Sequence, residues 1–145
     1  MTDGSYARAH LRSIEDPEGF WGEAASGIDW ITQPQKVLDD SRPPFYRWFK
    51  GGQLNTCYNA LDRHVIAGRG DQPAIHYDSP VTGTSRTLTY IELLDQVSRF
   101  GGALRALGVD KGDRVVIYMP MVPEAVVAML ACARIATTAS GTIGM

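Results

Sequence analysis

The sequence predicts a layered α/β fold, and three features of the chain support this prediction. Residues 115–119 are an apolar, largely β-branched run of the length of one strand. The residues after Pro123 are apolar on nearly every side of a helix, so that both segments need covering from two sides. Ahead of them, residues 89–107 have the pattern of an amphipathic helix. A buried strand followed by a buried helix is typical of the first unit of a larger α/β domain.

Composition and charge argue against several classes of partner. The 145 residues include 14 basic and 16 acidic residues, and the basic ones are scattered along the chain without forming a stripe. We therefore expect neither nucleic acid nor an anionic membrane as a partner. No run is long and apolar enough to span a bilayer, and the N-terminus lacks the apolar run of a signal peptide. Cys57 and Cys132 each lie among apolar residues and are interpreted as buried thiols, which fits a cytoplasmic location.

One helix is predicted near the N-terminus. Residues 6–14 are weakly amphipathic, and Asp16 followed by Pro17 predicts the cap and first residue of a helix that Gly27 ends. Three apolar residues of this helix are expected to face a core: Phe20, Trp21 and Ala24.

Residues 28–50 combine aromatic residues with prolines, which predicts an irregular strap with no long regular element. The aromatic residues are Trp30, Phe45, Tyr46, Trp48 and Phe49. Such side chains could form a surface for stacking sugars or bases, but the packing of a wrapping segment is the favoured interpretation.

Asn55 is predicted to cap a helix that ends at Gly68. Within it, Asp62 and His64 suggest an acid–base or metal site, yet adjacent residues on a helix point in different directions. No second His or Cys stands at ligand spacing, so hydrogen bonds at the surface or to another element are the favoured role of Asp62, Arg63 and His64. The other two histidines are equally isolated: His10 and His76. We therefore predict no metal ligand and no catalytic residue.

A β-hairpin and a capped helix are predicted next. Residues 74–77 and 86–88 are short strand candidates on either side of a loop. Thr89 and Glu92 have the spacing of a capping box, in which the hydroxyl and the carboxylate each satisfy a backbone N–H. The apolar face of the helix is predicted to comprise Leu93, Val97, Phe100, Leu104 and Leu107. Gly108 is expected to close it.

Two glycines and one loop shape the expectations for the rest of the chain. Gly101 and Gly102 each cost the helix about 1 kcal/mol relative to Ala, which predicts that another element packs closely against them.

The loop at residues 119–123 precedes a helix N-terminus, where a phosphate could bind. It has no glycine and two prolines, which lack N–H groups, so we do not expect an anion cradle there.

Several strings of the chain resemble AMP-forming short-chain acyl-CoA synthetases, a family of the adenylate-forming superfamily. They are residues 54–64 (LNTCYNALDRH), 112–115 (GDRV), 118–121 (YMPM) and 130–135 (LACARI). The resemblance runs from about residue 13 to residue 135. Residues 43–49 and 78–82 look closer to propionyl-CoA synthetases than to acetyl-CoA synthetases.

The resemblance implies an N-terminal fragment of the large α/β domain of such an enzyme. It implies an N-terminal cap region at residues 1–70, the start of the AMP-binding domain at residues 71–135, and a divergent tail at residues 136–145. The full-length family joins a small carboxylate to CoA through an acyl-adenylate, with ATP and Mg²⁺. This sequence has no glycine-rich phosphate loop followed by Lys, so we expect no ligase activity and no bound cofactor for the fragment alone.

The tail departs from the family's pattern. After Ile135 the family continues with a strand and a Phe-Gly-Gly turn of the CoA-binding region, whereas here the chain reads ATTASGTIGM. This change predicts a shift of reading frame, an early stop or an artificial junction, which sequencing the DNA beyond codon 145 would test.

Two alternatives from other functional classes stay open. The first is a non-catalytic interaction module that self-associates, or docks onto a partner, through the apolar helix after Pro123. The second is a free-standing nucleotide-binding domain, which the absence of a phosphate loop disfavours.

Overall fold

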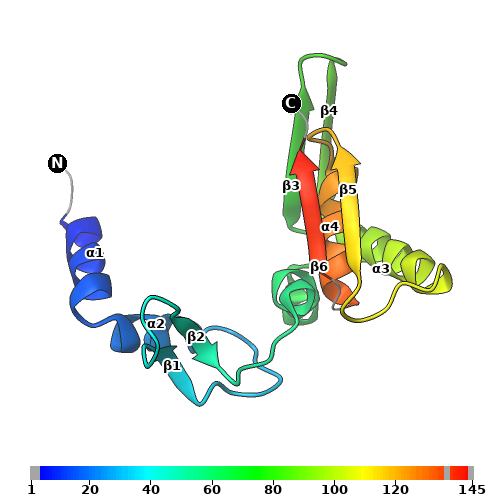
Figure 1. Ribbon diagram of the computed structural model, residues 1–145. Helices are drawn as coiled ribbons and strands as arrows, with labels where there is room; N and C mark the ends of the chain where they lie inside the picture. The colour runs from blue at the N-terminus through cyan, green and yellow to red at the C-terminus, as the bar shows by residue number, and fades with distance from the viewer. Residues whose placement is uncertain (1–3, 136–137, 144–145) are drawn as a thin grey trace. The chain divides into compact units, whose positions relative to one another are not determined.

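The computed structural model describes residues 4–135 and 138–143, and its chain divides into two compact units of mixed α/β structure (Figure 1). The first unit is Met1–Leu54 and the second is Asn55–Met145. Each unit has its own short strands and helices, and each is described by itself.

The first unit begins with two helices, α1 (Ser5–Glu15) and α2 (Pro17–Ala25). Asp16 caps α2, because its Oδ1 accepts a hydrogen bond of 3.0 Å from the backbone N–H of Gly19. Pro17 occupies the first position of the helix, where its missing N–H has no cost. The predicted start of this helix is therefore confirmed.

The predicted burial of α2 is wrong, since neither α1 nor α2 has a buried residue. Trp21 is 43% exposed, Ala24 is exposed, and Phe20 is only half-buried. The physical reason is the small size of the unit, whose sheet has only two short strands and cannot enclose a helix face. The aromatic rings pack on one another instead, with the ring centres of Trp21 and Trp48 6.2 Å apart in an edge contact.

The strap contains a short antiparallel hairpin that the sequence did not predict. Strands β1 (Lys36–Asp39) and β2 (Arg47–Lys50) pair with Leu38 opposite Trp48 and Asp39 opposite Arg47. Each strand has four residues, which is too short for a clear alternation of apolar and polar residues. The expectation of no long regular element agrees with these lengths.

The second unit opens with a helical segment over residues 56–69. It includes two π-helical stretches, η1 (Tyr58–Asp62) and η2 (Val65–Arg69), where an ordinary α-helix was expected. Gly68 has a φ of 77°, the left-handed conformation that ends helices, as its predicted role requires. Cys57 and Leu61 are buried on the inner face of the segment.

A hairpin follows, with β3 (Pro73–Ser79) antiparallel to β4 (Thr84–Thr89), which confirms both predicted strands. Helix α3 (Tyr90–Ala106) starts at the predicted capping box, where the carboxylate of Glu92 accepts a hydrogen bond of 2.8 Å from the backbone N–H of Thr89. The buried residues of α3 are Leu93, Val97, Gly101 and Leu104.

Two residues of the predicted apolar face of α3 lie outside the core. Phe100 is 40% exposed and Leu107 is 81% exposed. The buried stripe passes through Gly101 instead of Phe100, because α4 approaches the helix at that glycine. Leu107 follows the last residue of the helix and has left the stripe.

The C-terminal part is a β–α–β unit. Strand β5 (Arg114–Met119) leads into α4 (Pro123–Arg134), and β6 (Thr138–Ile143) returns parallel to β5 with Arg114 opposite Thr138. The strand and helix were predicted, but the divergent tail was not predicted to form a strand. A parallel return over a crossover helix lets β6 pair with the backbone edge of β5.

The prediction that β5 is covered on both faces is wrong for the described chain. Ile117 is 9% exposed and faces the core, whereas Val116 is 73% and Tyr118 is 82% exposed. Figure 1 shows α4 and α3 on one side of the β5–β6 pair only. The other face of the strand has no covering layer among residues 4–135 and 138–143.

Helix α4 itself is well covered, because six of its residues are buried: Pro123, Ala125, Val127, Ala128, Ala131 and Cys132. Val116 and Tyr118 of β5 are 73% and 82% exposed, whereas Met129 is the exposed large apolar residue of α4, at 40%. The strand is therefore more open than the helix, although the helix was the element expected to lack a cover. Among the described residues, none of the helices has both the length and the apolar character needed to cross a bilayer.

The two neighbouring glycines of α3 give a test of its packing against α4. A Cβ on Gly101 would lie 3.7 Å from Cγ2 of Ile135, whereas a Cβ on Gly102 meets nothing within 4 Å. We predict that Gly101→Leu lowers the free energy of unfolding by about 1–3 kcal/mol through overpacking. Gly102→Leu should raise it by about 0.5–1 kcal/mol, because helix propensity improves at an exposed site. Urea unfolding of both variants checks this, and equal effects of the two would contradict the packing.

Candidate functional site

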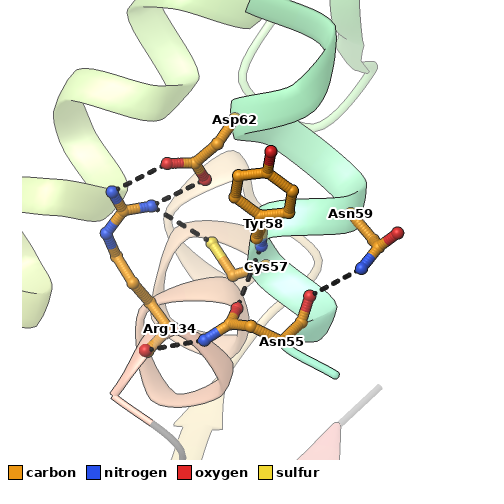
Figure 2. Close-up of polar contacts among 6 residues, drawn as sticks. All are labelled: Asn55, Cys57, Tyr58, Asn59, Asp62 and Arg134. Atoms are coloured by element: carbon orange, nitrogen blue, oxygen red, sulfur yellow. Dashed lines mark hydrogen bonds and ion pairs between the residues drawn. The ribbon is translucent and has the colours of Figure 1, made fainter. Parts of the chain in front are cut away.

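A polar cluster joins the helical segment 56–69 to the end of α4 (Figure 2). Asn55 caps the segment, since its Oδ1 accepts a hydrogen bond of 2.9 Å from the backbone N–H of Tyr58. Its Nδ2 donates a second hydrogen bond of 3.0 Å to the backbone carbonyl of Arg134. The first and last turns of a helix contain backbone N–H and C=O groups without a partner inside the helix. The side chain of Asn55 thus supplies a partner for one such N–H at the start of one helix and for one such C=O at the end of another.

Arg134 and Asp62 form a bidentate ion pair at the centre of the cluster (Figure 2). Nη1 of Arg134 lies 2.8 Å from Oδ2 of Asp62, and Nη2 lies 2.9 Å from Oδ1. The side chains are 31% and 18% exposed, so water screens the pair only in part. The hydrogen bonds to Asp62 raise the pKa of the Arg134 guanidinium above its ordinary value. Two parallel charge-assisted hydrogen bonds fix the relative orientation of the two helices.

The thiol of Cys57 completes the cluster. Its Sγ lies 3.7 Å from Nη1 of Arg134, and the residue is fully buried. Burial raises the pKa of the Cys57 thiol, so the sulfur stays protonated at neutral pH and is a poor nucleophile. Cys132 is also buried and outside any disulfide, which confirms the interpretation of both residues as buried thiols.

The structure separates the three consecutive polar residues that the sequence singled out. Asp62 makes the predicted bond to another element, while Nη1 of Arg63 donates to Oδ1 of Asn59 at 3.0 Å within its own segment. His64 contacts the Arg69 side chain and lies edge-on to the ring of Tyr90, with ring centres 5.2 Å apart. Partial burial of the His64 ring lowers its pKa, and the positive charges of Arg69 and Arg63 lower it further. The three side chains do not converge on one site.

The partner of Asp62 was not predicted. Arg134 is 72 residues away along the chain, and no local spacing connects the two positions. The second bond of Asn55, to the carbonyl of Arg134, was missed for the same reason. The only available signal was that Arg134 follows a run of apolar residues, 125–133, in the helix, since a charged residue in buried surroundings is typically paired.

The described residues offer no metal centre. No group of three or more His, Cys, Asp or Glu side chains could hold a metal ion within residues 4–135 and 138–143. His10 stacks on Tyr6 with ring centres 6.1 Å apart, and Nδ1 of His76 lies 3.1 Å from the hydroxyl of Thr87. Both histidines thus have local partners.

The loop between β5 and α4 uses its backbone donors internally. The N–H of Val122 donates to the carbonyl of Pro120 at 2.9 Å, and the N–H of Ala125 donates to the carbonyl of Val122 at 3.0 Å. With two prolines in the same loop, few N–H groups are left to point at an anion. The polar cluster joins two helices, and in the loop the N–H groups of Val122 and Ala125 are taken up by local carbonyls.

Sequence comparisons match nearly the whole chain. Residues 6–60 match the family described as acetyl-coenzyme A synthetase N-terminus, and residues 62–141 match the family described as AMP-binding enzyme. An acetyl-coenzyme A synthetase of Streptomyces avermitilis is 54% identical over 138 residues, which cover 95% of this chain and 21% of that protein. The mitochondrial acyl-CoA synthetase short-chain family member 3 of Rattus norvegicus is 54% identical over 91% of this chain and 19% of its own.

A solved structure has the same fold. The acetoacetyl-CoA synthetase of Streptomyces lividans superimposes with a TM-score of 0.83 and 34% identity, over 99% of this chain and 22% of that one. The chain therefore spans about a fifth of the length of the relatives it matches.

Because Asp62 and Arg134 form an ion pair, replacing Asp62 should strongly destabilise the protein. Asp62→Asn keeps the size of the side chain but leaves the guanidinium without its carboxylate, and we expect the free energy of unfolding to fall by about 2 kcal/mol. The matched control is Asp95→Asn, whose pair with Arg99 is exposed at 56% and 79% and should change stability by less than about 0.5 kcal/mol. Urea unfolding followed by circular dichroism measures both, and equal losses would contradict a special role for the pair.

Proposed function

Because the chain belongs to the AMP-binding enzyme superfamily, and within it to the acetyl-CoA and short-chain acyl-CoA synthetases, we propose that it supplies the N-terminal segment of such a ligase. The observation that carries the proposal is the 54% identity to an acetyl-coenzyme A synthetase over 95% of this chain. The chain is a mixed α/β piece that matches about a fifth of a synthetase structure. Its role is therefore proposed for the whole enzyme and not for the segment alone.

The proposed reaction of the whole enzyme has two steps. A small carboxylate attacks the α-phosphate of ATP, with Mg²⁺ present, to give an acyl-adenylate and pyrophosphate. The thiol of CoA then attacks the acyl carbon, and AMP leaves. Both steps need donors and cations aimed at developing negative charge. The guanidinium of Arg134 already binds Asp62, and the N–H of Val122 in the loop 119–123 donates to the carbonyl of Pro120, so we assign none of these steps to the present residues.

We propose propionate ahead of acetate as the carboxylate, and the cytoplasm as the location. The substrate preference is supported by residues 43–49 and 78–82, which resemble propionyl-CoA synthetases. The location is supported by the two buried thiols, Cys57 and Cys132, which form no disulfide, as a reducing compartment favours.

A second candidate function is an interaction module. The exposed side chains of Val116 and Tyr118, at 73% and 82%, leave one face of β5 apolar and open, as a protein-contact surface would be. Light scattering of the purified chain tests this candidate. A monodisperse monomer that does not bind a dye for exposed apolar surface would remove its basis.

The first test of the ligase proposal is pyrophosphate exchange. We predict that the purified 145-residue chain catalyses no propionate- or acetate-dependent exchange between ATP and pyrophosphate, while a full-length acetyl-coenzyme A synthetase under the same conditions does. Exchange by the chain alone, above a control without carboxylate, would overturn the proposal that the segment is inactive.

A chimaera tests whether the segment functions as part of an enzyme. We predict that residues 1–135 of this chain, replacing the matching residues of the Streptomyces avermitilis enzyme, leave its exchange activity within about tenfold of the parent. The ratio of activity on propionate to that on acetate should stay that of the parent, because the proposed acyl pocket lies outside this segment. A folded chimaera without activity would contradict the proposed equivalence, and a changed ratio would place acyl selection in this segment.

A further inference from the structure

A cavity of about 200 Å³ lies in the first unit, beside the loop that joins β1 to β2. It is large enough for a phosphate group and several waters. The residues that line it are Asp39, Ser41, Arg42, Phe45, Arg47 and Lys50. Three of these side chains are cationic and one is a carboxylate, so the cavity carries an excess of positive charge.

The local fold brings these residues together. Asp39 ends β1 directly opposite Arg47 at the start of β2. Between the strands the chain makes a tight turn, in which the backbone N–H of Phe45 donates to the carbonyl of Arg42 at 2.7 Å. The two central residues of this turn are prolines, whose rings fix φ and so limit the conformations available to the loop. Arg42 and Phe45 are thus held on either side of a rigid turn next to Arg47.

The single carboxylate of the cavity is already occupied. Oδ2 of Asp39 lies 2.7 Å from Nζ of Lys50, and its Oδ1 accepts a hydrogen bond of 3.2 Å from the backbone N–H of Ser41. The hydrogen bond from Lys50 makes the largest contribution, and with the bonds to Ser41 it holds the pKa of the Asp39 carboxyl well below its usual range. The carboxyl therefore stays ionised. Lys50 is therefore balanced, whereas neither Arg42 nor Arg47 forms an ion pair with any described residue.

We propose that this cavity binds a phosphate group, free or as a phosphomonoester, between the guanidinium groups of Arg42 and Arg47. The planar fork of arginine matches the oxygens of a phosphate with two parallel hydrogen bonds. A phosphate near neutral pH carries nearly two negative charges, which equals the charge that the two arginines leave unbalanced. The proposal concerns the first unit alone and does not depend on the ligase function.

Phe45 decides which phosphate compound fits best. Its side chain is 79% exposed at the rim of the cavity. An exposed aromatic ring next to a phosphate site offers a stacking surface for a base, and such stacking does not require a particular sequence or base. A nucleoside monophosphate could therefore place its phosphate between the arginines and its base on this ring.

The test is a titration of the 145-residue chain followed by NMR of its backbone amides. At low ionic strength, inorganic phosphate and AMP should each give saturable shifts confined to residues 39–50, with acetate at least tenfold weaker. Tighter binding of AMP that Phe45→Ala removes identifies a nucleotide phosphate as the ligand. Equal binding of phosphate and AMP identifies the phosphate group alone. Both outcomes support the site.

Matched variants distinguish binding at the cavity from non-specific attraction of phosphate to positively charged side chains. Arg42→Gln and Arg47→Gln should each weaken phosphate binding about tenfold, because each removes a charge-assisted pair of hydrogen bonds. Arg114→Gln removes an equal charge outside the cavity, in the second unit, and should leave the affinity unchanged. Absence of saturable shifts with either phosphate compound would overturn the proposal. So would equal binding of acetate, or unchanged affinity in a folded Arg42→Gln, Arg47→Gln double variant.

Discussion

The ion pair between Asp62 and Arg134 is the interaction on which the second unit depends. It joins residues 72 positions apart, so it closes a long loop of chain around the hairpin, α3 and β5. A partly buried pair of charges is stable only when its remaining hydrogen-bonding capacity is used. Here both oxygens of Asp62 accept from the guanidinium, and the backbone carbonyl of Arg134 accepts from Asn55. The cluster specifies where the helical segment sits on α4, in addition to any stability that it contributes.

Close contact between α3 and α4 is the second constraint, and it follows from small side chains. Gly101 of α3 faces Ala131, Arg134 and Ile135. The inner face of α4 is made largely of alanine and cysteine, which allow helix axes to approach closely. If this approach were wider, the guanidinium of Arg134 would move relative to Asp62. Packing in the apolar core and the geometry of the polar cluster are therefore coupled, although they involve different chemistry.

Local signals in the sequence predicted local structure well and long-range structure poorly. The caps at Asp16, Asn55 and Thr89 were all predicted, because a cap depends on residues within three positions. The closeness of Gly101 to another element was predicted from its helix-breaking cost, but Gly102 turned out to face open space. The partner of Asp62, the bare face of β5 and the strand β6 depend on which elements meet in three dimensions. No spacing within the sequence encodes those contacts.

The two units differ in whether their polar groups are free to bind a ligand. Electrostatic catalysis and anion binding both require donors that are fixed in place and not already bonded to the protein. In the second unit, Nη1 and Nη2 of Arg134 both donate to the carboxylate of Asp62, so the protein itself already occupies these donors. In the first unit a buried carboxylate balances only Lys50, and Arg42 in the turn at residues 42–45 and Arg47 at the start of β2 both line a cavity. By this criterion the part of the chain with the weaker core has the greater capacity to bind a ligand, and the part with the stronger core serves as a scaffold.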